Sequence, residues 1–220
     1  MTVYYAFKPS EGLREQISTL LSNLDSGVSA PQHALHTQLS VILTDEVMEH
    51  LLMTLVNAMK GKEGAGILST LAGLLKSTVH VLIKQLLGKH DNAEVNKMAQ
   101  YLRDKSLTLN GEARFGFALP DELGNRFVGL LQKTAAGEGV AHKAELVKAM
   151  MEFVDLAIAN LYDDFTKPMD LGFIKRKAVD LGRSTISKGS HSAISKLFPQ
   201  LGAEELKAFG AIYSEMIVQA

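Results

Sequence analysis

The stretch that decides the fold lies at residues 141–165, which read AHKAELVKAMMEFVDLAIANLYDDF. Its apolar side chains recur every three or four residues and share one side of a helix, while its charged side chains share the other. The apolar side comprises Leu146, Val147, Met150, Phe153, Val154, Ile158 and Leu161, and the charged side comprises Glu145, Lys148, Glu152 and Asp155. An amphipathic helix of this length needs other helices to cover it. We therefore predict an all-α, multi-helix bundle packed around residues 141–165 and around a second apolar stretch, residues 67–87.

The second stretch is long and apolar enough to span a bilayer. On a helical wheel, however, its polar residues fall together and face a broad apolar arc. The polar group is Ser69, Thr70, Lys76, Ser77, His80 and Lys84, and the apolar arc is Leu71, Leu74, Leu75, Val79, Leu82 and Leu86. We interpret this pattern as a central core helix that exposes one narrow polar strip, and we predict no membrane insertion.

Start and stop signals divide the chain into about eight or nine helices. Ser10 is predicted to cap a helix that ends near residue 24, and Pro31 is predicted to begin a helix that ends near residue 43. Thr44 is a suitable N-cap residue and predicts the start of a further helix. Further helices are predicted over residues 93–105, 120–136, 170–188, 192–198 and 203–218. The sequence has no repeat of fixed period and no long linker. We expect one helical domain over residues 1–220, with a weak seam at residues 106–120.

One β signal interrupts the helical pattern. Asn110-Gly111 stands between two extended runs, and both residue types tolerate the positive φ of a two-residue hairpin turn. The sequence therefore predicts a short β-hairpin near residues 107–117. Aromatic residues at the N-terminus, Tyr4, Tyr5 and Phe7, are expected to dock onto the body of the fold or onto a partner.

Composition narrows the class of protein. The chain has 220 residues, of which 46% are hydrophobic and 21% are charged, and a formal net charge of -1. This near-neutral balance supplies no global attraction to nucleic acid or to an anionic membrane. The absence of cysteine excludes disulfides, thiolate zinc sites, iron–sulfur clusters and cysteine nucleophiles. The N-terminus lacks a signal peptide pattern, and we expect a cytoplasmic protein with no cofactor.

Three local patterns contain residue types that occur in reactive or ligand-binding motifs. The glycines of residues 61–66 resemble a phosphate loop, but no lysine follows Gly66, which favours a connector. Two groups have metal-ligating residue types, and we interpret them as solvated faces: His33 and His36, and Glu46, Glu49 and His50. Ser190, His191 and Ser192 lack the elbow pattern of a hydrolase nucleophile and are interpreted as a turn between helices.

Basic residues dominate residues 167–196. Arg176, Lys177, Arg183 and Lys188 fall on one side of the predicted helix and are candidates for contact with an anion or an acidic partner. The alternative is a face that is solvated or paired within the protein. Nucleic-acid binding is disfavoured, because the overall charge is neutral and aromatic residues do not alternate with the basic ones.

Two residues break the amphipathic pattern. Asp164 falls near the apolar arc of residues 141–165, and Lys175 lies among apolar neighbours on the next helix. The simplest interpretation is that the lysine stem passes along apolar neighbours and its ammonium reaches water. A buried Asp164–Lys175 pair is the alternative, and it would mark a functional pocket.

The functional expectation rests mainly on what the sequence lacks. We hypothesise a non-enzymatic interaction or regulatory module that self-associates or binds another protein. The alternative is a bundle that binds a small apolar or anionic ligand in a pocket between helices, where flexible methionines such as Met48 and Met150 would be suitable lining residues. A third hypothesis is an enzyme whose residues converge only in three dimensions.

Overall fold

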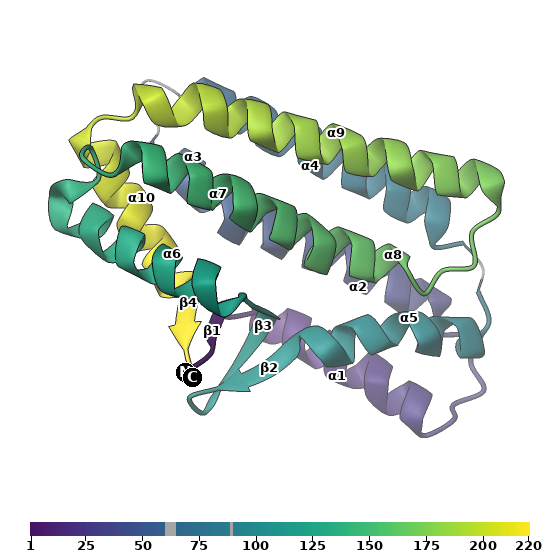
Figure 1. The fold of residues 1–220 in the computed structure, drawn as a ribbon. Coiled ribbons are helices and arrows are strands. Elements are labelled where there is room, and N and C mark those ends of the chain that lie inside the picture. Colours follow the sequence, from purple (N-terminus) through teal and green to yellow (C-terminus); the bar gives the residue numbers. More distant parts are fainter. Residues whose placement is uncertain (60–64, 89) are drawn as a thin grey trace.

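The computed structural model describes residues 1–59, 65–88 and 90–220 as a mostly helical bundle with a small sheet (Figure 1). The α-helices are α1 (Glu11–Asp25), α2 (His33–Met48), α3 (Thr54–Ala58), α4 (Ala65–Leu86), α5 (Asn92–Lys105), α6 (Asp121–Lys133), α7 (Lys143–Ala157), α8 (Asp164–Thr166), α9 (Phe173–Leu197) and α10 (Ala203–Met216). Three π-helical segments, η1 (Glu49–Met53), η2 (Thr134–Glu138) and η3 (Ile158–Asp163), and one 3-10 turn, η4 (Phe198–Gln200), extend them. The predicted helical bundle with a short β element is confirmed.

The sheet joins the two ends of the chain to the predicted hairpin. Its strands are β1 (Val3–Phe7), β2 (Ser106–Leu109), β3 (Glu112–Ala118) and β4 (Ile217–Gln219), in the order β2-β3-β1-β4 with every neighbouring pair antiparallel. Asn110 and Gly111 have φ of 50° and 80°, the left-handed conformations that a two-residue hairpin turn requires. The N-terminal aromatics therefore dock onto the body of the fold, because Tyr5 and Phe7 are buried in a central strand.

The helices form layers above this sheet (Figure 1). The outermost layer is the antiparallel helix pair α4 and α9, which we call the outer pair. Next to it lie two long helical rods, α2–η1–α3 and α7–η3–α8, which we call the inner layer. Helices α1 and α5 cover the opposite side near the sheet, and α6 and α10 lie at one end. One apolar core cluster includes residues from the sheet and from all of these layers.

Two predicted helix breaks do not occur. Thr44 lies inside α2, where its hydroxyl donates to the carbonyl of Ser40, and the rod continues through η1 into α3. Gly189 and Ser190 lie inside α9, which runs unbroken through the region interpreted as a turn. A Thr or Ser side chain can bond back to its own helix, so capping residue types do not end a helix whose apolar face is packed.

The predicted central position of residues 67–87 is also wrong. Helix α4 contacts α2 and α9 on one side and leaves a broad face exposed, including Leu74 and Val81. Among the described residues it is the one helix long and apolar enough to cross a membrane, and 33% of that stretch is buried. The apolar arc of the sequence is thus wider than the face that the inner layer covers.

Close packing between β1 and β3 requires a glycine at residue 116. A Cβ at Gly116 would lie 2.0 Å from the carbonyl oxygen of Tyr5, whereas a Cβ at Gly129 in α6 would meet nothing within 4 Å. We expect Gly116→Ala to lower the free energy of unfolding by about 3 kcal/mol or more, because the strands must separate. The matched control Gly129→Ala should raise it by about 0.5–1 kcal/mol through backbone entropy. Urea unfolding followed by circular dichroism measures both, and equal effects would contradict this packing.

Candidate functional site

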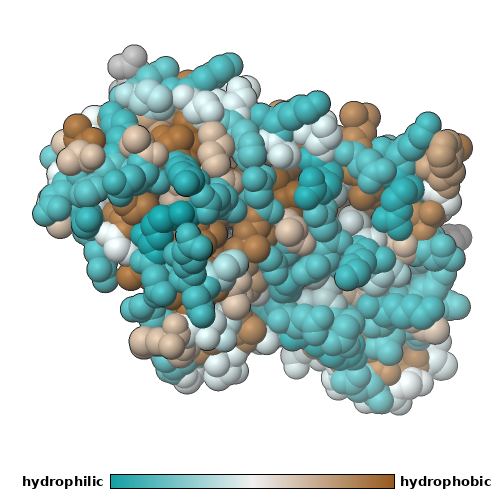
Figure 2. All heavy atoms as spheres, in the orientation of Figure 1, coloured by the Kyte–Doolittle hydropathy of each residue, from teal (hydrophilic) through white to brown (hydrophobic). Residues whose placement is uncertain are grey.

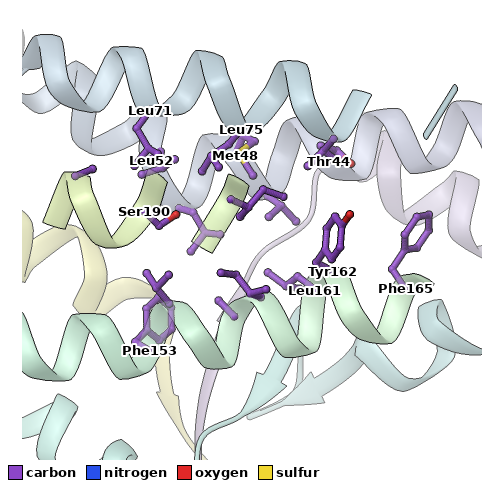
Figure 3. Close-up of a pocket in the computed structure, with 18 of the residues that line it drawn as sticks. Thr44, Met48, Leu52, Leu71, Leu75, Phe153, Leu161, Tyr162, Phe165 and Ser190 are labelled. Carbon is purple, nitrogen blue, oxygen red and sulfur yellow. The ribbon is translucent and has the colours of Figure 1, made fainter. Parts of the chain in front are cut away.

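An apolar cavity of about 160 Å³ lies between the outer pair and the inner layer (Figure 3). Each helix contributes the apolar side of its amphipathic pattern. The walls include Leu43, Val47, Leu51 and Leu52 from α2–η1, Leu68, Leu71, Leu75, Leu82 and Leu86 from α4, Phe153, Ile158, Leu161 and Phe165 from α7–η3–α8, and Ile186, Ala193 and Ile194 from α9. No charged side chain of the described residues lines the cavity.

The cavity follows the axes of the helices. Its lining extends along α4 from Leu68 to Leu86, a length of roughly 27 Å at 1.5 Å per residue. On the inner layer it extends from Met150 to Thr166. The close-up shows these side chains projecting from opposite walls toward the space between them (Figure 3). The shape is therefore that of a narrow space between parallel walls.

Two of the three π-helical segments, η1 and η3, form part of the cavity wall. A π turn inserts one residue and leaves a backbone carbonyl without its usual partner, and such turns occur frequently at functional sites. Tyrosine hydroxyls from other helices contact these segments. The hydroxyl of Tyr213 donates to the carbonyl of Leu51 at 2.7 Å, and that of Tyr101 donates to the carbonyl of Leu161 at 3.4 Å. Burial raises the pKa of both tyrosines, which keeps them protonated as donors.

The polar groups in the wall are almost all satisfied by the protein. Ser40, Thr44 and Thr166 each donate to the carbonyl four residues earlier in their own helix. Tyr162 donates to a backbone carbonyl of α9 at 2.7 Å, and burial raises the pKa of this tyrosine to about 12. Ser190 differs, because no described residue bonds its hydroxyl and it lies at the cavity wall (Figure 3). The site thus offers one hydroxyl to an otherwise apolar occupant.

Small residues and ion pairs hold the outer pair together and fasten it to the inner layer. A Cβ at Gly182 of α9 would lie 2.5 Å from Leu82 of α4, so the two helices approach closely at this point. The carboxylate of Asp45 contacts Lys76 and His80 of α4 at 3.0 and 2.9 Å. On the other side, His191 of α9 contacts Asp155 of α7 at 2.9 Å. None of these charged groups belongs to the lining of the cavity, whose interior is apolar.

The four basic residues that the sequence singles out do not share one face. Arg183 turns toward the inner layer and binds both oxygens of Asp163 at 2.8 and 2.9 Å, whereas Arg176 donates to the carbonyl of Met169, in the connection between α8 and α9, at 3.4 Å. Lys177 and Lys188 point outward and are exposed, and the Lys177 ammonium lies 4.4 Å from the centre of the Phe173 ring. A helical wheel groups these four residues because it contains no information about the groups outside the helix to which each arginine binds.

The hypothesis of a buried Asp164–Lys175 pair is corrected by the structure. Asp164 binds Lys105 of α5 at 2.8 Å, and Lys105 also donates to Asn160 at 2.7 Å. Lys105 is 7% exposed, whereas Lys175 is exposed at the start of α9. The missed signal lay in α5, where Lys105 occupies the same face as the buried Met98. Only the approach of α5 to η3 and α8 identifies the lysine that neutralises this acid.

The two groups with metal-ligating residue types form no metal site among the described residues. His36 lies in the core and is 2% exposed, so the interpretation of a solvated face is wrong for this residue. Burial, and to a smaller extent the charge of His90, lowers the pKa of His36 to about 4. Glu46 accepts hydrogen bonds from the N-terminal cap Ser10, and His50 stacks on Phe7 with ring centres 4.5 Å apart. Across residues 1–59, 65–88 and 90–220, no three metal-ligating side chains converge.

The other two candidate motifs give no reactive group. Residues 61–64 of the glycine loop lie outside the described residues, and Ala65 and Gly66 belong to the first turn of α4. Ser190 and His191 diverge along α9, with the serine at the cavity and the histidine at Asp155.

No family model, curated protein or solved structure matches this chain. The cavity, its single unpaired hydroxyl and the surrounding charges are therefore the basis for a proposed function.

The Lys105–Asp164 contact can be tested by a double-mutant cycle. We expect Asp164→Asn and Lys105→Met to couple by about 1–2 kcal/mol in the free energy of unfolding, because the buried ammonium loses its carboxylate partner. The cycle of Asp164→Asn with Lys175→Met should show coupling below about 0.3 kcal/mol. Chemical denaturation of the six proteins measures both cycles. Coupling to Lys175 alone would restore the Asp164–Lys175 pair that the sequence offered as an alternative.

The burial of His36 predicts a pH dependence of stability. The unfolded chain takes up a proton near pH 6.5, but the folded chain takes it up only near pH 4, so stability is full above pH 6.5 and falls as the pH drops toward 4. Between pH 7 and pH 5 this residue should remove about 2 kcal/mol of unfolding free energy. His36→Gln should reduce that loss, and His33→Gln, on the same helix, should retain it. Urea titrations at both pH values decide the outcome, and identical losses in the two variants would refute the assignment.

Proposed function

We propose that the protein binds an apolar small molecule in the cavity between the outer pair and the inner layer. The observation that carries this proposal is the lining: leucine, isoleucine, valine and phenylalanine side chains from the outer pair and from both rods of the inner layer converge on one space without a charged group among the described residues. Ligand sites are typically concave, mostly apolar and supplied with few polar groups, and this cavity has those properties. Of the two pocket ligands expected from sequence, the apolar one is favoured over the anionic one.

The wall chemistry specifies the class of ligand. A carboxylate or phosphate inside the cavity would meet no cation, and burying such a charge without a partner is costly. A neutral hydrocarbon or aromatic body gains from transfer out of water, at about 25 cal/mol per Å² of buried area. The hydroxyl of Ser190 can bond one neutral polar atom, such as a carbonyl or hydroxyl oxygen. We infer an elongated, uncharged and largely apolar ligand.

Energetics support an occupant. A space of about 160 Å³ that nothing fills destabilises a fold by about 4 kcal/mol. Apolar cavities of this size lined by leucine, isoleucine and phenylalanine bind small aromatic molecules. The π-helical segments η1 and η3 lie in the two walls that the inner layer contributes. The structure therefore bears a cost that an apolar ligand would offset.

Cavity-filling substitutions test the proposal against a merely structural role. Ala157 of α7 and Ala193 of α9 line the cavity, whereas Ala211 of α10 is exposed and does not. We expect the wild-type protein to bind the neutral fluorophore 1-aminoanthracene, and Ala157→Leu and Ala193→Leu to bind it at least tenfold more weakly, because added methyl groups occupy the space. Ala211→Leu should bind as the wild type does. Fluorescence titration measures the affinities.

Thermal unfolding of the same variants provides the control. A leucine that enters an existing space should leave the unfolding temperature unchanged or raised, while its loss of probe binding persists. A wild-type protein that does not enhance the fluorescence would refute the proposal. Equal affinities in the cavity and control variants would also refute it, because the probe would then bind elsewhere.

A further inference from the structure

The outer pair carries a charge opposite to that of the rest of the molecule. Lysine and arginine outnumber aspartate and glutamate by eight to one in α4 and α9 together, whereas acids outnumber bases by 23 to 15 in the remaining chain. The near-zero net charge is therefore the sum of a positively charged outer pair and a negatively charged remainder of the chain. The one acid of the pair, Asp180, is exposed and lies close enough to Tyr162 to contribute to the raised pKa of that tyrosine.

The same two helices carry most of the exposed large apolar side chains. Of eight such residues in the described part of the chain, five lie on the outer pair, with exposed fractions from 43% to 84%. They are Leu74 and Val81 of α4 and Phe173, Ile174 and Leu181 of α9. Apolar and hydrophilic side chains alternate along the edge of the molecule formed by α9 (Figure 2). Exposed apolar groups gathered on one element indicate an interaction surface.

These apolar and basic side chains belong to one surface. Ile174, Lys177, Leu181 and Lys188 follow one another at intervals of three, four and seven residues, which places them on one outward face of α9. Leu82 packs at Gly182, so the exposed Val81 and Leu181 lie at the same level of the pair. Exposed Lys84 extends the basic character onto α4. We call this surface the apolar–basic face.

We propose that the apolar–basic face docks onto the surface of an anionic lipid bilayer. Large apolar side chains with lysines among them are characteristic of helices that lie in the membrane interface. The apolar groups enter the boundary of the acyl chains, and the lysines bind the negative headgroups. The cavity lies directly beneath these helices. Docking would therefore bring it next to the phase in which an apolar ligand dissolves, and this part of the inference rests on the proposed function.

The charges of the apolar–basic face argue against the other occupants. A second copy docked through the same face would oppose one positive layer to another, which disfavours association. Nucleic acid would neutralise the lysines but would leave Phe173, Ile174 and Leu181 without an apolar partner. An anionic bilayer satisfies both kinds of side chain.

Vesicle sedimentation tests the proposal. Full-length wild-type protein should pellet with vesicles of 70% phosphatidylcholine and 30% phosphatidylglycerol, should remain in solution with phosphatidylcholine alone, and should be released by salt. The double variant Lys177→Gln, Lys188→Gln should bind the anionic vesicles roughly 30-fold more weakly, at about fivefold for each lysine. Leu181→Ser should weaken binding in the same direction. The matched control Lys97→Gln, Lys148→Gln removes two exposed lysines from α5 and α7 and should bind as the wild type does.

The outcomes separate docking from ligand binding. Equal pelleting with neutral and anionic vesicles, or equal losses in the two double variants, would overturn the proposal. Dimerisation that the Lys177→Gln, Lys188→Gln variant abolishes, without pelleting, would overturn it in favour of self-association. Probe binding in solution, measured without vesicles, should be unchanged in this variant, because neither lysine lines the cavity. Wild-type protein that pellets with anionic vesicles but does not bind the probe would support docking and refute the proposed ligand function.

Discussion

The packing of the outer pair onto the inner layer is the constraint on which the rest of the structure depends. Helices α4 and α9 form the outermost layer, and no described element covers their outward side. Each of the two helices can therefore bury apolar side chains on its inward side only. They approach each other at Gly182, where the glycine lets the helices pack without displacing Leu82. The cavity lies under this pair and the apolar–basic face lies over it, so both follow from one packing arrangement.

Two π turns lie in the apolar wall of the open space. In a regular helix the side chains of facing rods would interdigitate and fill the interior. The segments η1 and η3 each insert a residue into the helix, and Tyr213 and Tyr101 donate hydrogen bonds to the carbonyls of Leu51 and Leu161 within them. These tyrosines come from α10 and α5, so the cavity depends on helices that contribute little else to its lining. The architecture resembles a binding site maintained at some cost in stability.

Several local signals in the sequence had a meaning that only the neighbours reveal. Thr44 is a good capping residue, but inside a packed rod its hydroxyl bonds its own helix. The helical pattern predicts a solvated face for the polar His36, yet the orientation of α2 buries this residue in the core. Lys105 lies on the buried face of α5 and finds Asp164 on a distant segment. In each case a wheel describes one helix, whereas burial and pairing are properties of two or three helices together.

The sequence by itself determined the helical class, the hairpin at Asn110-Gly111, the cap at Ser10 and the long amphipathic helix of residues 141–165, because each depends on periodicity or on backbone preferences within a few residues. Tertiary structure decided the sheet formed by the chain ends, the outer position of α4, the cavity and the division of the α9 basic residues between two faces. These features arise where segments distant in sequence meet. Their contacts produce no periodic pattern in the sequence. The burial of each helix face depends on which other helix packs against it.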